Sequence, residues 1–358
     1  MILKSISLQN FRNYTKSDFS FNKKTTIIIG PNAVGKTNIL EAVYLLSTGK
    51  SFRTDKDKQI LKIGQTVCRI QSSVGVSGAE KNELEIVFAE SQTGFLQKKY
   101  LINGVSKRRS DFATKIPVVL FTPLDLDIVA GQPGVRRRFL DEVLTQTDSE
   151  YHQSQISYVK ALRQRNALLE QVQETGRRDD KLFAYWDELL IKTGQSISKK
   201  RLELIEYINK RQKEIFEFIL VYDQSVISEE RLLQYKSAEV GAGVTLVGPH
   251  RDDILIKAQN TNSKTAQEVR YFGSRGQQRL VSLEMKLAQI AMIKAHAENE
   301  PILLLDDVFS ELDSSNIEHV LNLMNMYQTL ATTTHEEFVG KHDLKNLDML
   351  RLEGKIKS

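Results

Sequence analysis

The sequence predicts an α/β fold into which a helical lobe is inserted. Residues 25–29 form a short apolar run that ends at Gly30, as a buried strand does, and from Asn38 apolar residues recur at three- and four-residue steps, as on a helix face. Helical spacing then fills residues 134–220, and strand-like runs return after Gly241. These observations predict an α/β domain assembled from the two ends of the chain, with an all-helical lobe between them.

The first third of the chain predicts a strand, a loop, a helix and then a β-rich layer. Apolar and polar residues roughly alternate over residues 2–8, which predicts a half-buried strand. Further strand-like runs lie at residues 67–76, 84–88 and 100–102. Asn103-Gly104 follows the last run, and this pair favours the tight two-residue turn of a β-hairpin.

The remainder of the chain changes from helices back to strands. Helices are predicted around residues 135–143, 156–162 and 182–189, and no seven-residue apolar repeat persists, so no long coiled coil is expected. Strands are then predicted at 254–256, 302–305 and 330–333, with a helix over 277–294. We therefore divide the chain into residues 1–118, 119–240 and 241–358, of which the first and last would form one head.

Length and composition restrict the class of protein. The 358 residues suffice for one large or two modest domains, and no window approaches the roughly 20 unbroken apolar residues that cross a bilayer. Because the N-terminus also lacks the pattern of a secretory signal, a cytoplasmic protein without membrane association is expected. Cys68 lies in an apolar run and is predicted to be a core residue. Together with six scattered histidines, it gives no zinc-binding spacing.

Positive charge is concentrated in the first third. The whole chain has a formal net charge of +5, but residues 1–118 carry 19 basic and 9 acidic side chains, and the other two segments are slightly acidic. A surface that binds a polyanion is therefore to be sought in this third. An excess of this size is also common on ordinary solvated surfaces, so it needs support from other features.

Eight residues after the first apolar run match G-x-x-x-x-G-K-[ST], the pattern of a phosphate-binding loop. Its glycines let backbone N–H groups surround phosphates at a helix N-terminus. Lys36 is expected to reach the β- and γ-phosphates of a nucleotide, and Thr37 to ligate Mg²⁺. The flanking strand and helix argue against a chance glycine turn. The predicted nucleotide-binding residues are Gly30, Pro31, Asn32, Ala33, Val34, Gly35, Lys36, Thr37 and Asn38.

A second apolar run, at residues 302–305, ends in the carboxylates Asp306 and Asp307. Asp306 is expected to join Thr37 in the Mg²⁺ shell, and Asp307 to orient or deprotonate an attacking water. Many strands end in aspartate, and aspartate also caps helices. The assignment of Asp306 and Asp307 to a nucleotide site therefore depends on the phosphate loop upstream.

The segment 273–278 stands directly before the predicted helix at 277–294. A serine with small or flexible neighbours at a helix N-terminus forms an anion-binding end, since free N–H groups and the positive end of the helix dipole face outward. Ser274 suits an ordinary helix cap equally well, and the chemistry of the segment alone leaves both interpretations open.

These motifs resemble the ABC-type ATPases in order and spacing. The phosphate loop corresponds to Walker A, residues 274–277 to the signature motif, the strand ending at Asp306 and Asp307 to Walker B, and residues 310–313 to the D-loop. More narrowly, the chain resembles the RecF family of bacterial DNA replication and repair proteins. Residues 8–14, 35–42, 51–53, 131–133 with 136–141, and 248–253 carry this resemblance, which extends from near residue 1 to about residue 334.

The resemblance implies an ATPase head like those of the SMC proteins, with a compact helical lobe in place of their long coiled coils. In such heads the signature of one chain touches the γ-phosphate bound by another, which implies a homodimer that closes on two ATP and Mg²⁺. Lys36 and Asp307 would be catalytic together with Ser274 of the partner copy. An aspartate at 307, where most ABC ATPases have glutamate, implies slow turnover. The signature would comprise Ser274, Arg275, Gly276 and Gln277, and the D-loop Ser310 and Asp313.

The resemblance also concerns single residues. Arg12 and Asn13 are similar to nucleotide-contacting residues of SMC-like heads, although ordinary exposed polar residues would look the same. His335 stands where many ABC ATPases carry a switch histidine, but sequences like RecF need not have one, so a solvated loop histidine stays open. His250 and Arg251 belong to a RecF-like segment for which the residues alone suggest no role.

Basic residues flank the predicted hairpin. Exposed lysines there often serve only to protect a strand edge. The resemblance makes them candidates for contacting the phosphates of duplex DNA without sequence preference, and residues 136–138 are a second candidate group whose role is equally well structural. The DNA-binding candidates at the hairpin are Lys98, Lys99, Lys107, Arg108 and Arg109.

The function implied by the resemblance is that of an ATP-dependent clamp in recombinational repair and the SOS response. ATP would close the dimer on double-stranded or gapped DNA, partners resembling RecR and RecO would join, and the recombinase RecA would then be loaded. Slow, DNA-stimulated hydrolysis would reset the clamp. The alternative is a structural head that organises a protein complex, which the missing heptads disfavour. An ABC transporter subunit would need a membrane partner, and the RecF-like segments do not support it.

Overall fold

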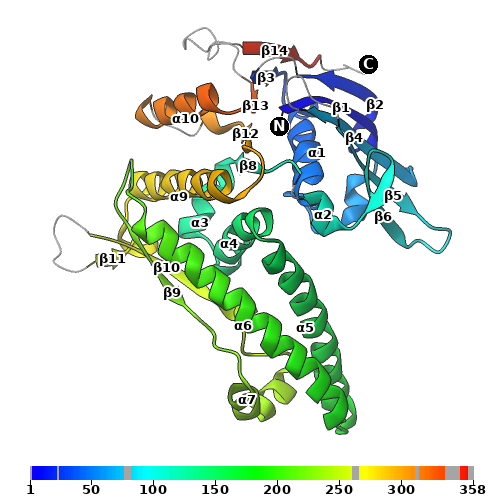
Figure 1. Cartoon of the computed structure of the whole chain (residues 1–358), viewed down its shortest axis with the longest axis vertical. Helices are drawn as coiled ribbons and strands as arrows, with labels where there is room; N and C mark the ends of the chain where they lie inside the picture. Colours follow the sequence, from blue (N-terminus) through cyan, green and yellow to red (C-terminus); the bar gives the residue numbers. More distant parts are fainter. Residues whose placement is uncertain are drawn as a thin grey trace. The chain divides into compact units, whose positions relative to one another are not determined.

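The computed structural model describes residues 2–21, 24–75, 82–113, 115–259, 266–310, 314–334 and 347–353. The chain forms two compact units (Figure 1). The first unit comprises Met1–Pro123 and Ile290–Ser358, and the second comprises Leu124–Gln289. The second unit is thus an insertion within the first.

The first unit contains most of the strands. Its elements are β1 (Ile2–Phe11), β2 (Tyr14–Ser20), β3 (Thr25–Ile29), α1 (Lys36–Thr48), the 3₁₀ turn η1 (Asp57–Ile60), β4 (Val67–Gly75), β5 (Asn82–Glu90), β6 (Leu96–Ile102), β7 (Val105–Lys107), α2 (Arg109–Ala113), β8 (Val118–Phe121), β12 (Ile302–Asp306), the 3₁₀ turn η4 (Val308–Ser310), α10 (Ser314–Met326), β13 (Thr329–Thr333) and β14 (Leu347–Arg351).

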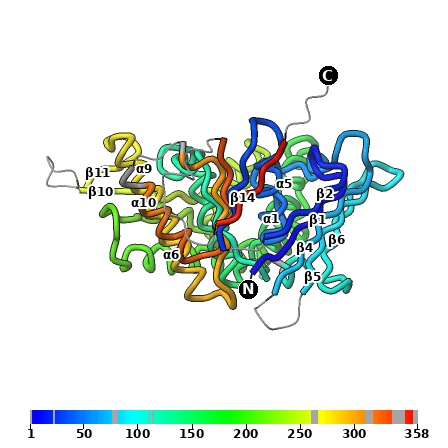
Figure 2. Tube along the Cα trace, turned by 90° about the horizontal axis from the view of Figure 1, so that it is seen from above, coloured from blue at the N-terminus to red at the C-terminus, as the bar shows by residue number. Residues whose placement is uncertain are grey.

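Two sheets form the framework of this unit. Among the described residues, an antiparallel sheet has the order β2-β1-β4-β5-β6-β7, and a parallel sheet has the order β14-β3-β13-β12-β8. Strand β14 pairs with β3, so segments from the two ends of the sequence lie side by side in the parallel sheet (Figure 2). The strands β3, β8 and β13 are buried at every residue, as expected for parallel strands covered on both faces.

Helix α1 lies in the core that both sheets share. Its apolar side chains surround the helix, and eleven of its thirteen residues are buried. A helix that is apolar on all sides must be covered on all sides. Ile39, Leu40 and Val43 pack in one cluster with Leu8 of β1 and Leu304 of β12. This packing fixes the N-terminal end of α1, which carries the phosphate loop.

The second unit holds the long helices and a small sheet. It contains α3 (Asp127–Ala130), α4 (Pro133–Thr147), α5 (Ser149–Thr175), α6 (Asp180–Lys210), β9 (Ile219–Asp223), α7 (Glu229–Ala242), the 3₁₀ turn η3 (Pro249–Arg251), β10 (Asp253–Gln259), β11 (Ala266–Glu268), α8 (Val269–Phe272) and the part of α9 (Arg275–His296) up to residue 289, while the turn η2 (Pro123–Leu126) lies at its beginning. The strands pair in the order β11-β10-β9.

The predicted fold class is confirmed, with one correction to the lobe. Segment 119–240 is not all helical, because β9 within it pairs with β10. The sequence division after residue 118 falls inside β8, and that after 240 falls inside α7. The predicted helical run ends at residue 220, inside this strand, because the exposed positions of β9 carry the apolar residues Ile219 and Val221 and its sequence therefore shows no alternation of apolar and polar residues. Among the described residues the longest helices are α5 and α6, which have 27 and 31 residues and pack against each other. This length is only about four heptads, so the described residues contain no long coiled coil.

Several local predictions are confirmed. Cys68 is fully buried in the core, and burial raises the pKa of its thiol to about 12. Asn103 and Gly104 both have positive φ, as the predicted hairpin turn between β6 and β7 requires. Among the described residues, no helix is both long and apolar enough to cross a membrane.

Candidate nucleotide-binding site

The phosphate loop connects β3 to α1 in a strained, closely packed path. Ala33 and Gly35 have positive φ of 64° and 116°, so the loop turns twice through the left-handed region. A Cβ at Gly35 would lie 2.7 Å from the hydroxyl of Tyr14, and one at Gly30 would lie 2.6 Å from the carbonyl oxygen of Leu352. Both glycines of the motif are therefore favoured by packing within the protein alone.

Lys36 points back into the loop. Its ammonium donates to the carbonyl oxygens of Gly30 at 2.6 Å and Pro31 at 3.0 Å. Burial lowers the pKa of Lys36, while the nearby carboxylates of Asp307 and Asp306 act in the opposite direction. The ammonium is thus placed between the loop and the Walker B carboxylates, where phosphate oxygens would compete with the two carbonyls for it.

Three elements meet at Asp306. Thr37 at the start of α1 and Thr332 on β13 both donate their hydroxyls to Oδ1 of Asp306, each at 2.8 Å. The contact between Thr37 and Asp306 joins residues 269 positions apart in the sequence. The structure therefore brings Thr37 and Asp306 together, while their shared binding of Mg²⁺ stays a prediction.

Asp307 is held in an unusual backbone conformation. Its φ is 52°, and its N–H donates to the hydroxyl of Thr332 at 3.0 Å. Such a φ is uncommon for a residue other than glycine, and it persists where surrounding contacts enforce it. Thr332 therefore fixes both carboxylate residues, because the same hydroxyl accepts from one and donates to the other.

The oxygen groups at this point fit Mg²⁺. Hydroxyl and carboxylate oxygens are the ligands that this hard cation prefers, and it commonly takes only one or two of them from the protein, with phosphates and water completing the shell. Thr37 and Asp306 are in direct contact and would hold such an ion between them.

Arg12 and Asn13 contact the protein in two different ways. Arg12 forms a bidentate ion pair with Glu41 of α1, with Nε at 2.9 Å from Oε2. Asn13 donates to the carbonyl of Val34 in the phosphate loop at 2.9 Å and accepts from Asn38 at 2.7 Å. The structure thus places Asn13 and Asn38 against the loop and Arg12 behind it, while a contact with nucleotide stays a prediction for all three.

The signature segment lies in the second unit and has the geometry of a capping box. The N–H of Gln277 donates to Oγ of Ser274 at 3.2 Å, and the side chain of Gln277 accepts from the N–H of Ser274 at 2.9 Å. The cap interpretation is therefore confirmed for Ser274. It does not exclude the signature role, because the cap uses a lone pair of the hydroxyl oxygen and leaves its proton available for a phosphate.

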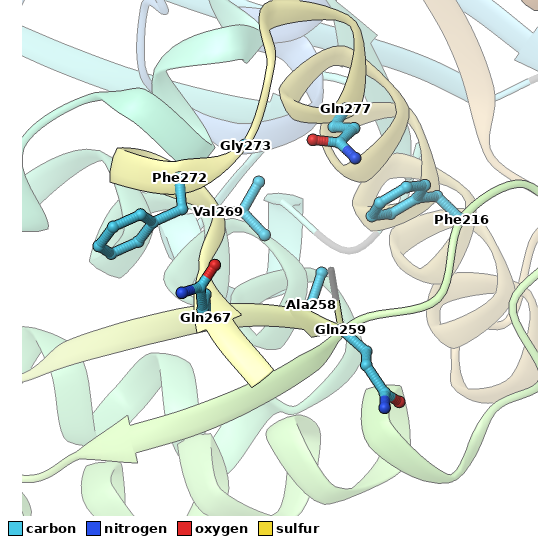
Figure 3. A pocket seen from close by; sticks show the side chains of 8 residues that line it. All are labelled: Phe216, Ala258, Gln259, Gln267, Val269, Phe272, Gly273 and Gln277. Atoms are coloured by element: carbon cyan, nitrogen blue, oxygen red, sulfur yellow. The ribbon is translucent and has the colours of Figure 1, made fainter. Parts of the chain in front are cut away.

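The surroundings of the signature segment are open and partly apolar. Ser274, Arg275 and Gly276 are exposed. Beside them lies a shallow pocket that α8, the strands β10 and β11 and the start of α9 line, with Phe272 and Gln277 at its rim (Figure 3). The N-terminal end of α9 is thus accessible from solvent.

Some predicted site residues lie outside the described residues. These are Asp313 of the D-loop and His335, the candidate switch histidine. Ser310 ends the turn η4, but its side chain is not described. The roles predicted for these three residues stay predictions.

The basic residues at the hairpin do not form one surface. Lys98 donates to Asp57 at 3.0 Å and to the carbonyl of Gly49 at 2.8 Å, and Arg109 donates to the carbonyl of Thr48 at 2.9 Å. Burial lowers the pKa of both side chains. Both are used within the protein and leave the set of DNA-binding candidates. Lys98 and Lys99 are neighbours in the sequence but face opposite sides of strand β6, because a strand alternates between faces, and Arg109 begins helix α2.

Lys99, Lys107 and Arg108 are exposed. Lys99 lies on the outer face of the antiparallel sheet, in one row with Arg69, since both pair with Val87. Arg69 in turn forms an ion pair with Glu85 at 2.7 Å. The positive charge of Arg69 on this face is therefore paired with an acidic neighbour.

The second group of basic residues is partly structural. Arg136 forms a bidentate ion pair with Asp253, at 2.7 and 2.9 Å, and Arg137 donates to the carbonyl of Asp252 at 2.6 Å. Arg138 is exposed. Two of these three arginines therefore tie helix α4 to the start of β10.

The RecF-like segment 248–253, for which the sequence suggested no role, forms the polar core of the second unit. Nδ1 of His250 lies 2.7 Å from the hydroxyl of Tyr158, and Nε2 lies 3.0 Å from the carbonyl of Thr245. Burial lowers the pKa of His250 to about 4. Arg201 on α6 contacts Asp252 at 3.0 Å and Asp141 at 2.8 Å. The segment therefore joins the long helices to β10.

Sequence reasoning missed three residues around the phosphate loop: Thr332, Glu41 and Tyr14. Tyr14 donates to the carbonyl of Gly35 at 3.2 Å, and burial raises the pKa of this hydroxyl to about 12. A motif search could not find them, since each gains its role from partners far away in the sequence. The sequence offered one signal, for Glu41: a charged residue stands among the apolar residues of the predicted helix, and such a residue needs a partner when it is buried.

Comparisons with known proteins agree with this geometry. A family model of the RecF/RecN/SMC N terminal domain matches residues 2–356. The DNA replication and repair protein RecF of Agathobacter rectalis is 38% identical over 352 residues, which cover 95% of this chain and 94% of that protein. The protein of the same name from Halalkalibacterium halodurans is 35% identical over 376 residues, covering 99% and 98%.

Two solved structures are similar over nearly the whole chain. One is described as the recombination mediator protein RecF-ATPrS in the RecFOR pathway, with a TM-score of 0.84, 27% identity, and coverage of 98% of this chain and 95% of that chain. The other is described as RecF-ATP in the same pathway, with a TM-score of 0.82, 28% identity, and coverage of 93% and 92%.

Proposed function

The chain belongs to the RecF/RecN/SMC N-terminal domain family, and from this premise we propose that it is an ATP-dependent DNA clamp of recombinational repair. Its relatives are DNA replication and repair proteins, and the similar solved structures carry ATP or an ATP analogue in their descriptions. In this proposal ATP closes a homodimer on double-stranded or gapped DNA. Proteins resembling RecR and RecO then join, and RecA is loaded indirectly.

The observation that carries the proposal is the contact between Thr37 and Asp306. It joins the phosphate loop to the Walker B carboxylates at 2.8 Å, next to the buried ammonium of Lys36. This arrangement provides one half of an ABC-type site. The signature segment at Ser274 belongs to the other unit, and a second copy would supply it to complete the site.

Each residue has a defined task in the proposed hydrolysis. Lys36 binds the β- and γ-phosphates, and Thr37 and Asp306 hold Mg²⁺, which when bound neutralises charge on the phosphates. Asp307 orients the attacking water against the γ-phosphate. The Ser274 hydroxyl of the second copy donates to the same phosphate. The shorter side chain of aspartate at position 307 makes turnover slow.

DNA binding in this proposal is electrostatic. Lys99, Lys107 and Arg108 are the exposed hairpin residues that contribute contacts with phosphates. Such contacts release counterions, so binding falls steeply as salt increases and shows no sequence preference.

Light scattering tests the clamp. We would measure the mass in solution with and without ATP and a short gapped duplex, for the wild type, Lys36→Met and Ser274→Arg. ATP should double the mass of the wild type and strengthen DNA binding at low salt. Lys36→Met should lose ATP binding, and Ser274→Arg should bind ATP yet stay monomeric. A wild type that hydrolyses ATP while monomeric would refute the shared site, and only a phosphate-loop ATPase would be left.

A further inference from the structure

A buried carboxylate lies directly behind the phosphate loop. Glu41 is one helical turn after Thr37 on α1, and its side chain has no exposed surface. It accepts from Arg12, whose Nε is 2.9 Å from Oε2, and from the hydroxyl of Ser51, and the guanidinium of Arg53 lies 3.6 Å away. A buried charge is costly unless it is paired in this way.

Arg12 connects the Glu41 carboxylate to the turn between β1 and β2, in which Arg12 itself lies. Its φ is 51°, its N–H donates to the carbonyl of Ile60 at 2.9 Å, and its Nη1 donates to the carbonyl of Gln59 at 2.6 Å. The next residue, Asn13, donates to the carbonyl of Val34 in the loop at 2.9 Å. The turn therefore has little freedom while Glu41 holds the guanidinium.

A second path closes a ring of polar contacts. Arg53 donates to Asn38 at 2.6 Å, and Asn38 donates to Asn13 at 2.7 Å. The ring thus runs from Glu41 through Arg12, Asn13, Asn38 and Arg53 back to Glu41. It contains two guanidinium groups and one carboxylate, so removal of the carboxylate leaves two like charges close together without their common partner.

We propose that Glu41 is a positioning residue for nucleotide binding, acting through Arg12 and Asn13 on the backbone of the phosphate loop. This inference deepens the proposed function and rests on it. The loop binds phosphate with backbone N–H groups, whose directions depend on where the loop is held. Glu41 touches the loop only through its partners, so its loss acts on ATP affinity by moving them.

The sign of the effect separates positioning from simple electrostatics. Removing a negative charge beside a phosphate site makes the site more positive, which by itself tightens the binding of an anion. Loss of positioning weakens binding. Glu41→Gln should therefore bind ADP about tenfold more weakly, the size expected when a hydrogen bond to a charged group is lost.

Calorimetric titration with ADP and Mg²⁺ tests the proposal, because ADP probes the loop without the dimer. Glu239→Gln is the matched control, since Glu239 is also a fully buried glutamate paired with an arginine, Arg165, at 2.7 Å, but lies in the second unit. Both variants should lower the melting temperature, and Glu41→Gln alone should raise the Kd for ADP. Equal or tighter binding by Glu41→Gln would overturn the proposal.

A double-mutant cycle shows whether the effect passes through Asn13. Asn13→Ala should weaken ADP binding by itself, and adding Glu41→Gln should weaken it no further, although the stability cost of Glu41→Gln should persist. Additive losses of affinity would contradict the pathway. If Glu41→Gln does not fold, Ser51→Ala is the second variant, because it removes one hydrogen bond to the Glu41 carboxylate without a change of charge. It should raise the Kd for ADP about threefold, the effect of one weaker hydrogen bond. An unchanged Kd there would refute the proposal.

The failure of this inference is distinguishable from that of the proposed function. A wild type that binds neither ADP nor ATP would overturn both. A wild type that binds nucleotide through Lys36, together with a Glu41→Gln variant of unchanged affinity, would overturn the inference alone.

Discussion

Replacement of Thr332 by valine should remove the hydrogen bonds that the side chain of this β13 residue makes with Asp306 and Asp307. Valine keeps the shape and the β-branch of threonine, so it suits the buried strand β13. It removes the hydroxyl that donates to Asp306 at 2.8 Å and accepts from the N–H of Asp307 at 3.0 Å. Thr37 still contacts Asp306 in the variant, whereas the left-handed conformation of Asp307 loses the contact described here.

The size of the effect follows from the two bonds. A hydrogen bond to a charged group contributes about 1.5–3 kcal/mol, and depriving a buried N–H of its acceptor costs about 1–3 kcal/mol, of which the lower end applies to the partly buried N–H of Asp307. Because Thr37 retains Asp306, we expect a loss nearer the lower sum, about 2–3 kcal/mol. For a unit of this size each kcal/mol lowers the melting temperature by about 2–4 °C, so Thr332→Val should melt about 5–10 °C below the wild type.

Hydrolysis should decrease more than stability suggests. A displacement of about 1 Å at a catalytic group can lower a rate about a hundredfold, and Asp307 is the residue proposed to orient water. Thr332→Ser keeps the hydroxyl and is the control. Melting would be followed by calorimetry, and ATP turnover measured at temperatures where both variants are folded. If Thr332→Val and Thr332→Ser have the same turnover and melting temperature, the hydroxyl does not act as we reason.

Three other perturbations test separate parts of the structure. Burial lowers the pKa of His250 from 6.5 to about 4, so between these values the unfolded chain binds a proton at this side chain more readily than the folded chain. The folded state therefore loses stability as the pH falls from 6.5 towards 4. His250→Gln should remove this contribution to the decrease in melting temperature, measured between pH 7 and pH 4. Gly30→Ala should lower both the melting temperature and ADP affinity, because its Cβ would lie 2.6 Å from the backbone oxygen of Leu352, and wild-type values would refute this contact. Lys98→Met should lower the melting temperature, because it removes the ion pair with Asp57. Lys99→Gln should leave the melting temperature unchanged and reduce the salt dependence of DNA binding by about one phosphate contact. The reverse pattern would show that the two lysines are assigned to the wrong faces of β6.

Motifs with fixed local spacing were predictable from the sequence. The phosphate loop needs a strand, a glycine turn and a helix in immediate succession, and all three signals lie within residues 25–46. The Walker B strand is recognisable for the same reason, as an apolar run ending in Asp306 and Asp307. For Ser274 the sequence left a helix cap and an anion-binding signature equally open, and the structure shows the capping contacts, which join residues only three positions apart.

Residues whose roles come from distant partners were not predictable in this way. Thr332 looks like any threonine of a buried strand until Asp306 is placed beside it, and Glu41 looks like a surface residue of a helix until the helix is found to be covered on all sides. Lys98 and Lys99 look alike in the sequence, and only the register of β6 against β5 shows that they face opposite directions.

The order of strands in the parallel sheet has a consequence for biosynthesis. Within the part of the chain that the structure describes, strand β3, which carries the phosphate loop, pairs with β13 and β14, and β8 pairs with β12, so no two described strands from the first 121 residues are neighbours in this sheet. At about 5–20 residues per second, a ribosome needs roughly 15–50 s after Thr37 to deliver Asp306, 269 positions later. The inserted unit can fold during this interval, while the apolar strand β3 still lacks its partner strands in the parallel sheet. The ATPase half of the molecule is therefore the last to become competent, after every other part has been made.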